Sequence, residues 1–314
     1  MISEPIKKSS AQNYEIKWQK FLLYLTSENV PLQNIEFQHV INFLTHLFHV
    51  KALKPTTIAH YRSALTLPLK LKWNIDLRVP EVNSLIRAMT LQRPKSITTA
   101  PSWKLSSVLD LLEKGTEPTS EISAEIMCLR KAAFLLLLAT GWRISELHAC
   151  VRDEEFCNFT ENSSLIIRPH ASFLAKNEAR KRMSFKEVKP LINKDTNTPS
   201  CLCPVAALRS YLQHTGNKQS GKLFLSPSNH DKILTVQQLG SHIRSLIKTA
   251  DPSSKVKTHD IRKLAASHSF VETMVIGDLV SNFNWSSPAV FISITLLRQK
   301  HCLDQFPCQH SPLY

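Results

Sequence analysis

The sequence predicts a mainly helical protein that carries a small antiparallel β-sheet in its second, larger part. Three observations lead to this fold class. Glycines number only 6 in 314 residues, so turn-forming residues are scarce. Apolar residues recur at helical spacing through the first ninety residues. The period changes to that of short strands only between residues 164 and 192.

Four amphipathic segments predict a compact helical unit over residues 1–93. Pro55 and Pro80 come just before the third and fourth segments, and proline is favoured in the first turn of a helix. The apolar positions of the four segments are Tyr14, Trp18, Phe21, Leu22, Leu25; Phe37, Val40, Ile41, Leu44, Leu47; Ile58, Tyr61, Leu65; and Val82, Leu85, Ile86, Met89.

Residues 94–102 predict a linker, because they hold two prolines and no apolar period. The second domain then covers residues 103–314. Short strands are expected over residues 164–169 and 182–186, joined by the polar turn 175–180. Helices are expected over residues 103–112, 121–140, 205–214, 236–250 and 260–272.

Charge points to a polyanionic partner. Lysine and arginine exceed aspartate and glutamate by 14, and half of this excess lies in the first hundred residues, which hold 13 basic and 6 acidic side chains. A basic excess spread over both domains suits a protein that surrounds double-stranded DNA, although a generically basic intracellular protein is the alternative. Lys51, Lys54, Arg62, Lys70 and Lys72 crowd the third helix and are the expected DNA contacts; a solvated basic face is the other interpretation.

Other classes of protein fit less well. The longest apolar run, Ala132–Ala139, is too short to span a bilayer, so no membrane partner is expected. The seven cysteines are irregularly spaced, and Cys201-Leu202-Cys203 lacks zinc-binding spacing, so neither a metal nor another cofactor is expected. Reduced thiols indicate the nucleus or the cytoplasm, and a DNA partner favours the nucleus.

Two short motifs carry the chemistry. Ala139-Thr140-Gly141-Trp142-Arg143 is followed by Glu146 and Leu147, and more than a hundred residues later His259 and Arg262 lie three apart on one expected helical face. Two guanidinium groups suit the oxygens of a phosphate, and an imidazole can handle a proton. Lys176 lies at the tip of the expected hairpin, where an ammonium group could protonate a leaving oxygen.

The two motifs resemble those of the tyrosine recombinase (phage integrase) family, which read roughly A-T-G-x-R-x-x-E-L and H-x-x-R. Further segments resemble the recombinases of DIRS-like retrotransposons: residues 172–177, 203–212 and 285–292, together with residues 100–109 of the interdomain region. The resemblance implies a helical core-binding domain followed by a catalytic domain. It makes Arg143 and Arg262 the phosphate-binding arginines, Lys176 the general acid and His259 the histidine of the second motif. Trp285 falls where the family carries His or Trp beside the phosphate, and Glu146 is expected to support the first arginine.

One part of the family pattern is missing. Thr295 occupies the position of the nucleophilic tyrosine, and its hydroxyl is shorter and less acidic than a phenol. No tyrosine follows before Tyr314, in a tail that does not resemble the family.

Two functional hypotheses follow from this departure. The chain is either a recombinase that uses Tyr314 or a tyrosine from another copy, or a recombinase-derived protein that binds DNA without cutting it, and strict chemistry favours the second. A relative of type IB topoisomerases is a third, weaker interpretation. The expected partners are double-stranded DNA and further copies of the chain on that DNA.

Overall fold

A computed structural model describes residues 8–94, 101–115, 124–174, 183–193, 196, 198–216 and 221–273. Within these residues the chain is mostly helical and carries a small antiparallel sheet, which confirms the predicted fold class. The chain separates into two compact units, Met1–Thr98 and Thr99–Tyr314. The boundary between them falls inside the segment 94–102.

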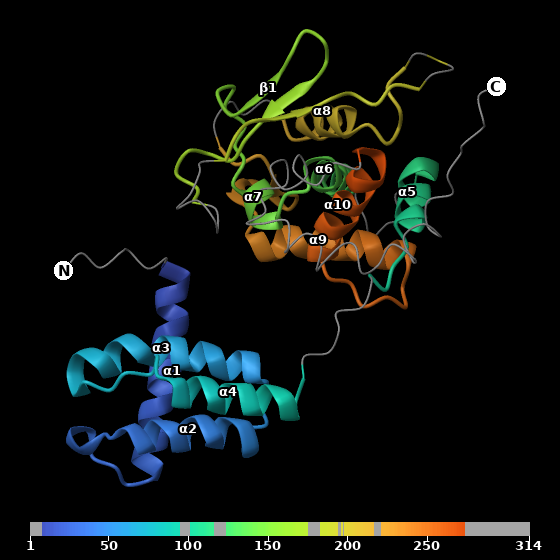
Figure 1. The fold of residues 1–314 in the computed structure, drawn as a ribbon. Helices are drawn as coiled ribbons and strands as arrows, with labels where there is room; N and C mark the ends of the chain where they lie inside the picture. Colours follow the sequence, from blue (N-terminus) through green and yellow to red (C-terminus); the bar gives the residue numbers. More distant parts are fainter. Residues whose placement is uncertain are drawn as a thin grey trace. The chain divides into compact units, whose positions relative to one another are not determined.

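The N-terminal unit consists of four helices, one at each of the expected amphipathic segments. They are α1 (Lys8–Ser27), α2 (Phe37–His49), α3 (Pro55–Trp73) and α4 (Pro80–Gln92), with a short 3-10 turn at Leu32–Asn34. Both α3 and α4 begin with a proline, as expected. In Figure 1, α2, α3 and α4 run alongside one another and α1 crosses them. Aromatic packing fills the space between the helices, as in the rings of Phe21 and Phe43, 5.1 Å apart.

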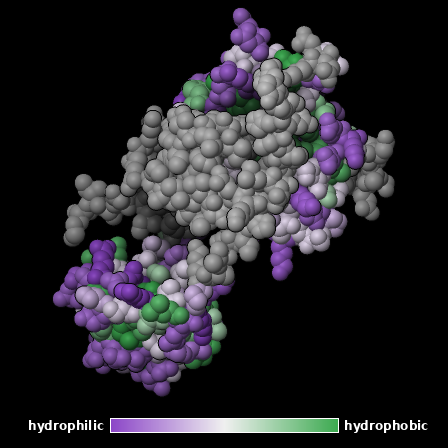
Figure 2. Space-filling model, turned by 45° about the vertical axis from the view of Figure 1, so that its right-hand side comes forward, coloured by the Kyte–Doolittle hydropathy of each residue, from purple (hydrophilic) through white to green (hydrophobic). Residues whose placement is uncertain are grey.

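Apolar side chains also reach the surface of this unit. On the face shown in Figure 2, hydrophobic residues interrupt an otherwise hydrophilic surface. The exposed leucines of the unit include Leu23 on α1 and both Leu67 and Leu71 on α3.

The second unit is built around one buried helix. Helix α6 (Ala124–Thr140) has an almost continuous apolar sequence in its second half, and residues 132–137 are all buried. A helix that is apolar all round belongs in a core, and α6 accordingly packs against α8 (Pro204–His214), α9 (Val236–Ala250) and α10 (His259–Thr273) (Figure 1). Helices α5 (Leu105–Lys114) and α7 (Ile144–His148) complete the helical part.

A three-stranded antiparallel sheet, β1 (Cys157–Phe159), β2 (Leu165–Ile167) and β3 (Lys186–Val188), lies beside these helices. Strand β2 agrees with the expected strand, but the prediction of a strand over residues 182–186 is wrong, because β3 begins where that strand was expected to end. Side chains alternate between the two faces of a strand, and in β3 Lys186 and Val188 share one face. Val188 is buried, whereas Phe185 is 44% exposed.

A second hairpin, β4 (Leu225–Ser226) with β5 (Asn229–Ile233), was not expected from the sequence. Its strands are short, and β5 is largely polar, so no apolar alternation marks it. Among the described residues, no helix is both long and apolar enough to cross a membrane.

Candidate phosphate-binding site

The site begins where α6 ends. The Thr140 hydroxyl donates to the carbonyl of Leu136 at 2.7 Å, and the Gly141 N–H donates to the carbonyl of Leu137 at 2.9 Å. Gly141 has a φ of +63°, which glycine adopts without the steric penalty that a side chain brings. The chain therefore turns sharply out of α6 and presents Arg143 at the start of α7.

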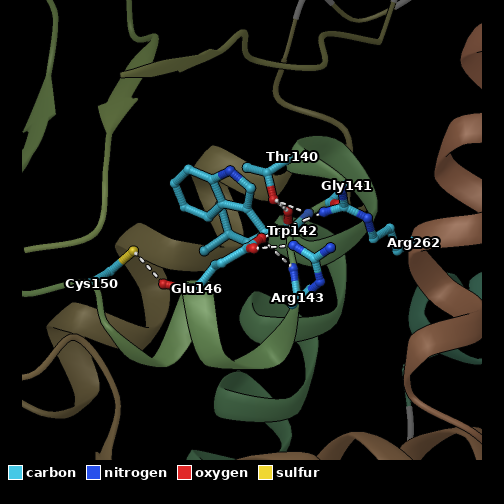
Figure 3. A network of polar contacts seen from close by, with 8 residues as sticks. Thr140, Gly141, Trp142, Arg143, Glu146, Cys150 and Arg262 are labelled. Carbon is cyan, nitrogen blue, oxygen red and sulfur yellow. Dashed lines mark hydrogen bonds and ion pairs between the residues drawn. The ribbon is translucent and has the colours of Figure 1, made fainter. Parts of the chain in front are cut away.

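Glu146 holds Arg143 in place (Figure 3). The carboxylate accepts the backbone N–H of Arg143 at 2.7 Å through Oε2 and the guanidinium Nη1 of the same residue at 2.6 Å through Oε1. A glutamate three residues after the N-cap commonly accepts the backbone N–H of that cap. Glu146 is only 2% exposed, whereas the side chain of Arg143 is 29% exposed. Arg143 is therefore anchored at one nitrogen and still reaches the surface.

Arg262 comes to the same carboxylate from α10. Its Nη1 donates to the carbonyl of Gly141 at 2.8 Å and lies 3.5 Å from Oε2 of Glu146. The side chain is 3% exposed. Burial, together with the nearby charge of Arg143, lowers the pKa of Arg262 to about 10, although Glu146 opposes this shift. The two arginines of the sequence motifs, far apart in the chain, thus share one buried glutamate.

His259 is the first residue of α10 and lies at the surface. Its pKa is below the ordinary value because part of the ring is removed from water and because Lys263, Arg262 and Arg143 lie nearby. A depressed pKa keeps the imidazole neutral at physiological pH, so one ring nitrogen can donate a hydrogen bond and the other can accept one.

Lys186 is a basic residue of this region that sequence reasoning missed. It pairs with Ile167 across the sheet, and residues directly opposite in an antiparallel pair point to the same face. Ile167 is fully buried, so Lys186 lies on the inner face. Burial and the charge of Arg262 lower the pKa of Lys186. The signal in the sequence was the alternation Lys186-Glu187-Val188, which places Lys186 on the same face as the buried valine.

Several expected site residues lie outside the described residues: Lys176, Trp285, Thr295 and Tyr314. The structure therefore brings together Arg143, Glu146, His259 and Arg262 from the two motifs.

The basic residues expected to contact DNA lie in the N-terminal unit. Lys51 and Lys54 are exposed beside the start of α3. Lys70 is 3.6 Å from the carboxylate of Asp76, and the ammonium group of Lys72 lies 4.9 Å from the ring centroid of Trp73. Arg62 donates to the side chain of Asn83. Lys51 and Lys54 thus precede α3, whereas Arg62, Lys70 and Lys72 lie within it.

The arrangement of the second unit favours an anion. Among the described side chains, Arg143, Arg262 and Lys186 bring positive charge to the region, and Glu146 contributes the carboxylate that contacts both arginines. Lys263 adds a further positive charge near His259, but it forms an ion pair with Asp260 at 2.7 Å. Guanidinium groups form charge-assisted hydrogen bonds with phosphate oxygens. A phosphate group at the exposed edge of Arg143 would meet this positive field and the ring of His259.

No family model and no curated protein sequence matches the chain. Solved structures do share its fold. The Tn1549 transposon integrase in complex with transposon right end DNA aligns with 90% of this chain and 89% of its own, with a TM-score of 0.60 and 14% identity. The XerH site-specific recombinase bound to palindromic difH substrate, in a post-cleavage complex, aligns with 94% of this chain and 78% of its own, with a TM-score of 0.61 and 15% identity. The chain thus shares the fold of these solved integrase and recombinase structures, with a helical unit followed by a unit of helices and short strands.

Proposed function

We propose that this protein binds double-stranded DNA as a member of the tyrosine recombinase class, most similar to the recombinases of DIRS-like retrotransposons. The observation that carries the proposal is the pair of arginines, Arg143 and Arg262, joined by the buried Glu146. The likeness in fold to integrases and recombinases solved with DNA supports it. In this proposal the second unit holds a DNA phosphate at Arg143 and His259, and the N-terminal unit contacts the duplex through exposed lysines such as Lys51 and Lys54.

The proposed chemistry requires no metal. A phosphoryl transition state gathers negative charge on its oxygens, and fixed positive groups stabilise that charge. Arg143 would contact the phosphate directly, while the buried Arg262 and the half-buried Lys186 would add positive potential at the site. His259 would donate a hydrogen bond or accept a proton. We assign the general acid to Lys176 and the packing beside the phosphate to Trp285.

We further propose that strand cleavage is lost or impaired. The register of the motif after Trp285 puts Thr295 where the family has tyrosine. A threonine hydroxyl is a weaker acid than a phenol and ends closer to the backbone, so it cannot replace the phenolate at the same phosphate. The alternative is an enzyme that takes its tyrosine from position 314 or from another copy assembled on the same DNA. Either way, DNA as the partner favours the nucleus.

A nicked suicide duplex, which traps a covalent protein–DNA intermediate, tests the proposal. We expect no covalent adduct with the parent chain and an adduct with Thr295→Tyr, because the substitution would restore a phenol at the position that the family motif gives to the nucleophile. Tyr314→Phe is the matched control and should behave as the parent does. An adduct that forms with the parent and is lost in Tyr314→Phe would show that the chain is an active recombinase with its nucleophile at the terminal tyrosine.

A further inference from the structure

The segment that enters the second unit touches both chain segments that carry the arginines. Trp103 is fully buried, and its ring packs edge-on against Phe134 of α6, with the centroids 6.3 Å apart. Helix α6 leads directly to Gly141 and Arg143. The neighbouring residue, Ser102, instead reaches the loop 251–258, which precedes α10 and the residues His259 and Arg262.

One hydroxyl makes two bonds to this loop. The Ser102 Oγ accepts the backbone N–H of Lys255 at 2.9 Å and donates to the carbonyl of the same residue at 3.2 Å. Ser102 therefore satisfies both backbone groups of Lys255, as a neighbouring strand would. The two residues are 153 positions apart in the sequence, so this is a long-range tertiary contact within the unit.

Other contacts hold the rest of the loop. Near α10, the Asp260 N–H donates to the Lys257 carbonyl at 2.9 Å, and Val256 packs against the core of the unit. The hydroxyl of Ser254 donates to the Asp251 carbonyl at 2.8 Å, and the hydroxyl of Ser253 donates to the Asp251 carboxylate at 2.9 Å. These bonds secure the exit from α9. Ser102 secures the middle of the loop, four residues before His259.

His259 depends on this loop more than Arg262 does. Arg262 is held through its own side chain by the Gly141 carbonyl and by Glu146. The imidazole of His259 has no hydrogen-bond partner within the described part of the chain. The position of the imidazole is therefore determined by the backbone at the start of α10, and the loop 251–258 directly precedes that start.

We propose that Ser102 is a positioning residue, which fixes the loop 251–258 and thereby places His259 beside Arg143 and Arg262. The inference rests on the proposed function, because the position of His259 matters for activity only if the site binds a phosphate. Since Ser102 is the last residue of the predicted linker 94–102, the same contact connects the point where the chain enters this unit with the geometry of the site.

The test compares Ser102→Ala, which removes the hydroxyl, with Ser102→Thr, which keeps it. Ser106→Ala is the matched control, because Ser106 is an exposed serine on α5 whose hydroxyl makes no hydrogen bond to any described residue. Two readouts need no DNA: hydrogen exchange at the amide of Lys255, and the pKa of His259 by NMR, assigned with a His259→Gln variant. Duplex affinity is measured in parallel.

We expect the Lys255 amide to exchange about two- to tenfold faster in Ser102→Ala, as the loss of one hydrogen bond implies. The pKa of His259 should rise toward its ordinary value, because the ring moves into water and away from Arg143 and Arg262. Ser102→Thr and Ser106→Ala should match the parent. Should Ser102→Ala not fold, Ser102→Cys, a near-isostere with a much weaker hydrogen-bonding group, carries the same comparison.

A folded Ala or Cys variant with parental exchange at Lys255 and a parental pKa of His259 would overturn the positioning role. Absence of duplex binding by the parent would instead count against the proposed function, and the two DNA-free readouts would still decide the role of Ser102. If both proposals hold, Ser102→Ala should also weaken duplex binding, and Ser102→Thr should restore it.

Discussion

Glu146→Gln is the substitution with the largest expected effect on stability in the candidate site. The side chain keeps its shape but loses the charge that two arginines share. Glu146 is 2% exposed and accepts two short hydrogen bonds from Arg143, while Arg262 lies 3.5 Å away. A hydrogen bond that involves a charged group contributes about 1.5–3 kcal/mol. Removing one partner from a buried ion pair destabilises by about 3–5 kcal/mol, because the other charge stays buried.

We therefore expect Glu146→Gln to lower the free energy of unfolding of the second unit by about 3 kcal/mol, near the lower end of that range, since the Gly141 carbonyl still accepts a bond from Arg262. Urea denaturation followed by circular dichroism measures the change. Glu155→Gln is the matched control: Glu155 also pairs with an arginine, Arg168, at 3.2 Å, but its side chain is 68% exposed. Exposed pairs contribute about 0–1 kcal/mol. Equal, small losses in both variants would refute the structural role assigned to the shared carboxylate.

Further predictions concern pH and the interior of the second unit. The pKa of His259 is lower in the folded than in the unfolded chain, so the unfolded chain binds the proton more readily. His259 therefore contributes stability that is present above its unfolded pKa and is lost as the pH falls through its folded pKa. His259→Gln should reduce the loss of stability between pH 7 and pH 5, measured as the midpoint of urea denaturation. Arg152, which is 9% exposed and bonds Gly216, Thr215 and Leu223, should have a structural role alone. Arg152→Ala should lower the unfolding free energy by about 3 kcal/mol, and a change below 1 kcal/mol would contradict this role. At a temperature where the variant remains folded, its duplex affinity should equal that of the parent.

The helices were predictable because their signals are local. Apolar spacing and the prolines at the first positions of α3 and α4 mark the helices of the N-terminal unit, and α9 has the bounds that its amphipathic pattern predicts. The short strands were less predictable. Each strand of the three-stranded sheet has only three residues, which is too short for an apolar alternation to fix its bounds, and the strand predicted over residues 182–186 was therefore misplaced.

The residues of the candidate site could be predicted from the sequence, but the contacts between them could not. Sequence motifs identified Arg143, His259 and Arg262 and assigned Glu146 to the first arginine. The packing of α10 against α6 brings Arg262 to Glu146 and to the carbonyl of Gly141. No local pattern encodes such a contact between segments more than a hundred residues apart. For the same reason, the hydrogen bond between Ser102 and Lys255 could not be predicted from the sequence.

Duplex affinity measured against salt concentration tests the central claim most directly, with the parent, Arg143→Ala and the control Arg209→Ala. Arg209 is an exposed arginine on α8 that stacks on Phe159, 4.1 Å from the ring centroid, and the ion pairs of Glu146 are with Arg143 and Arg262 instead. The parent should bind duplex DNA, with the logarithm of affinity falling steeply and linearly with the logarithm of salt concentration. Arg143→Ala should bind about tenfold or more weakly and reduce the slope by about one, as the loss of a single phosphate contact requires. Arg209→Ala should match the parent. No duplex binding at low salt, or an Arg143→Ala variant with parental affinity and slope, would contradict the assignment of this site to DNA phosphate.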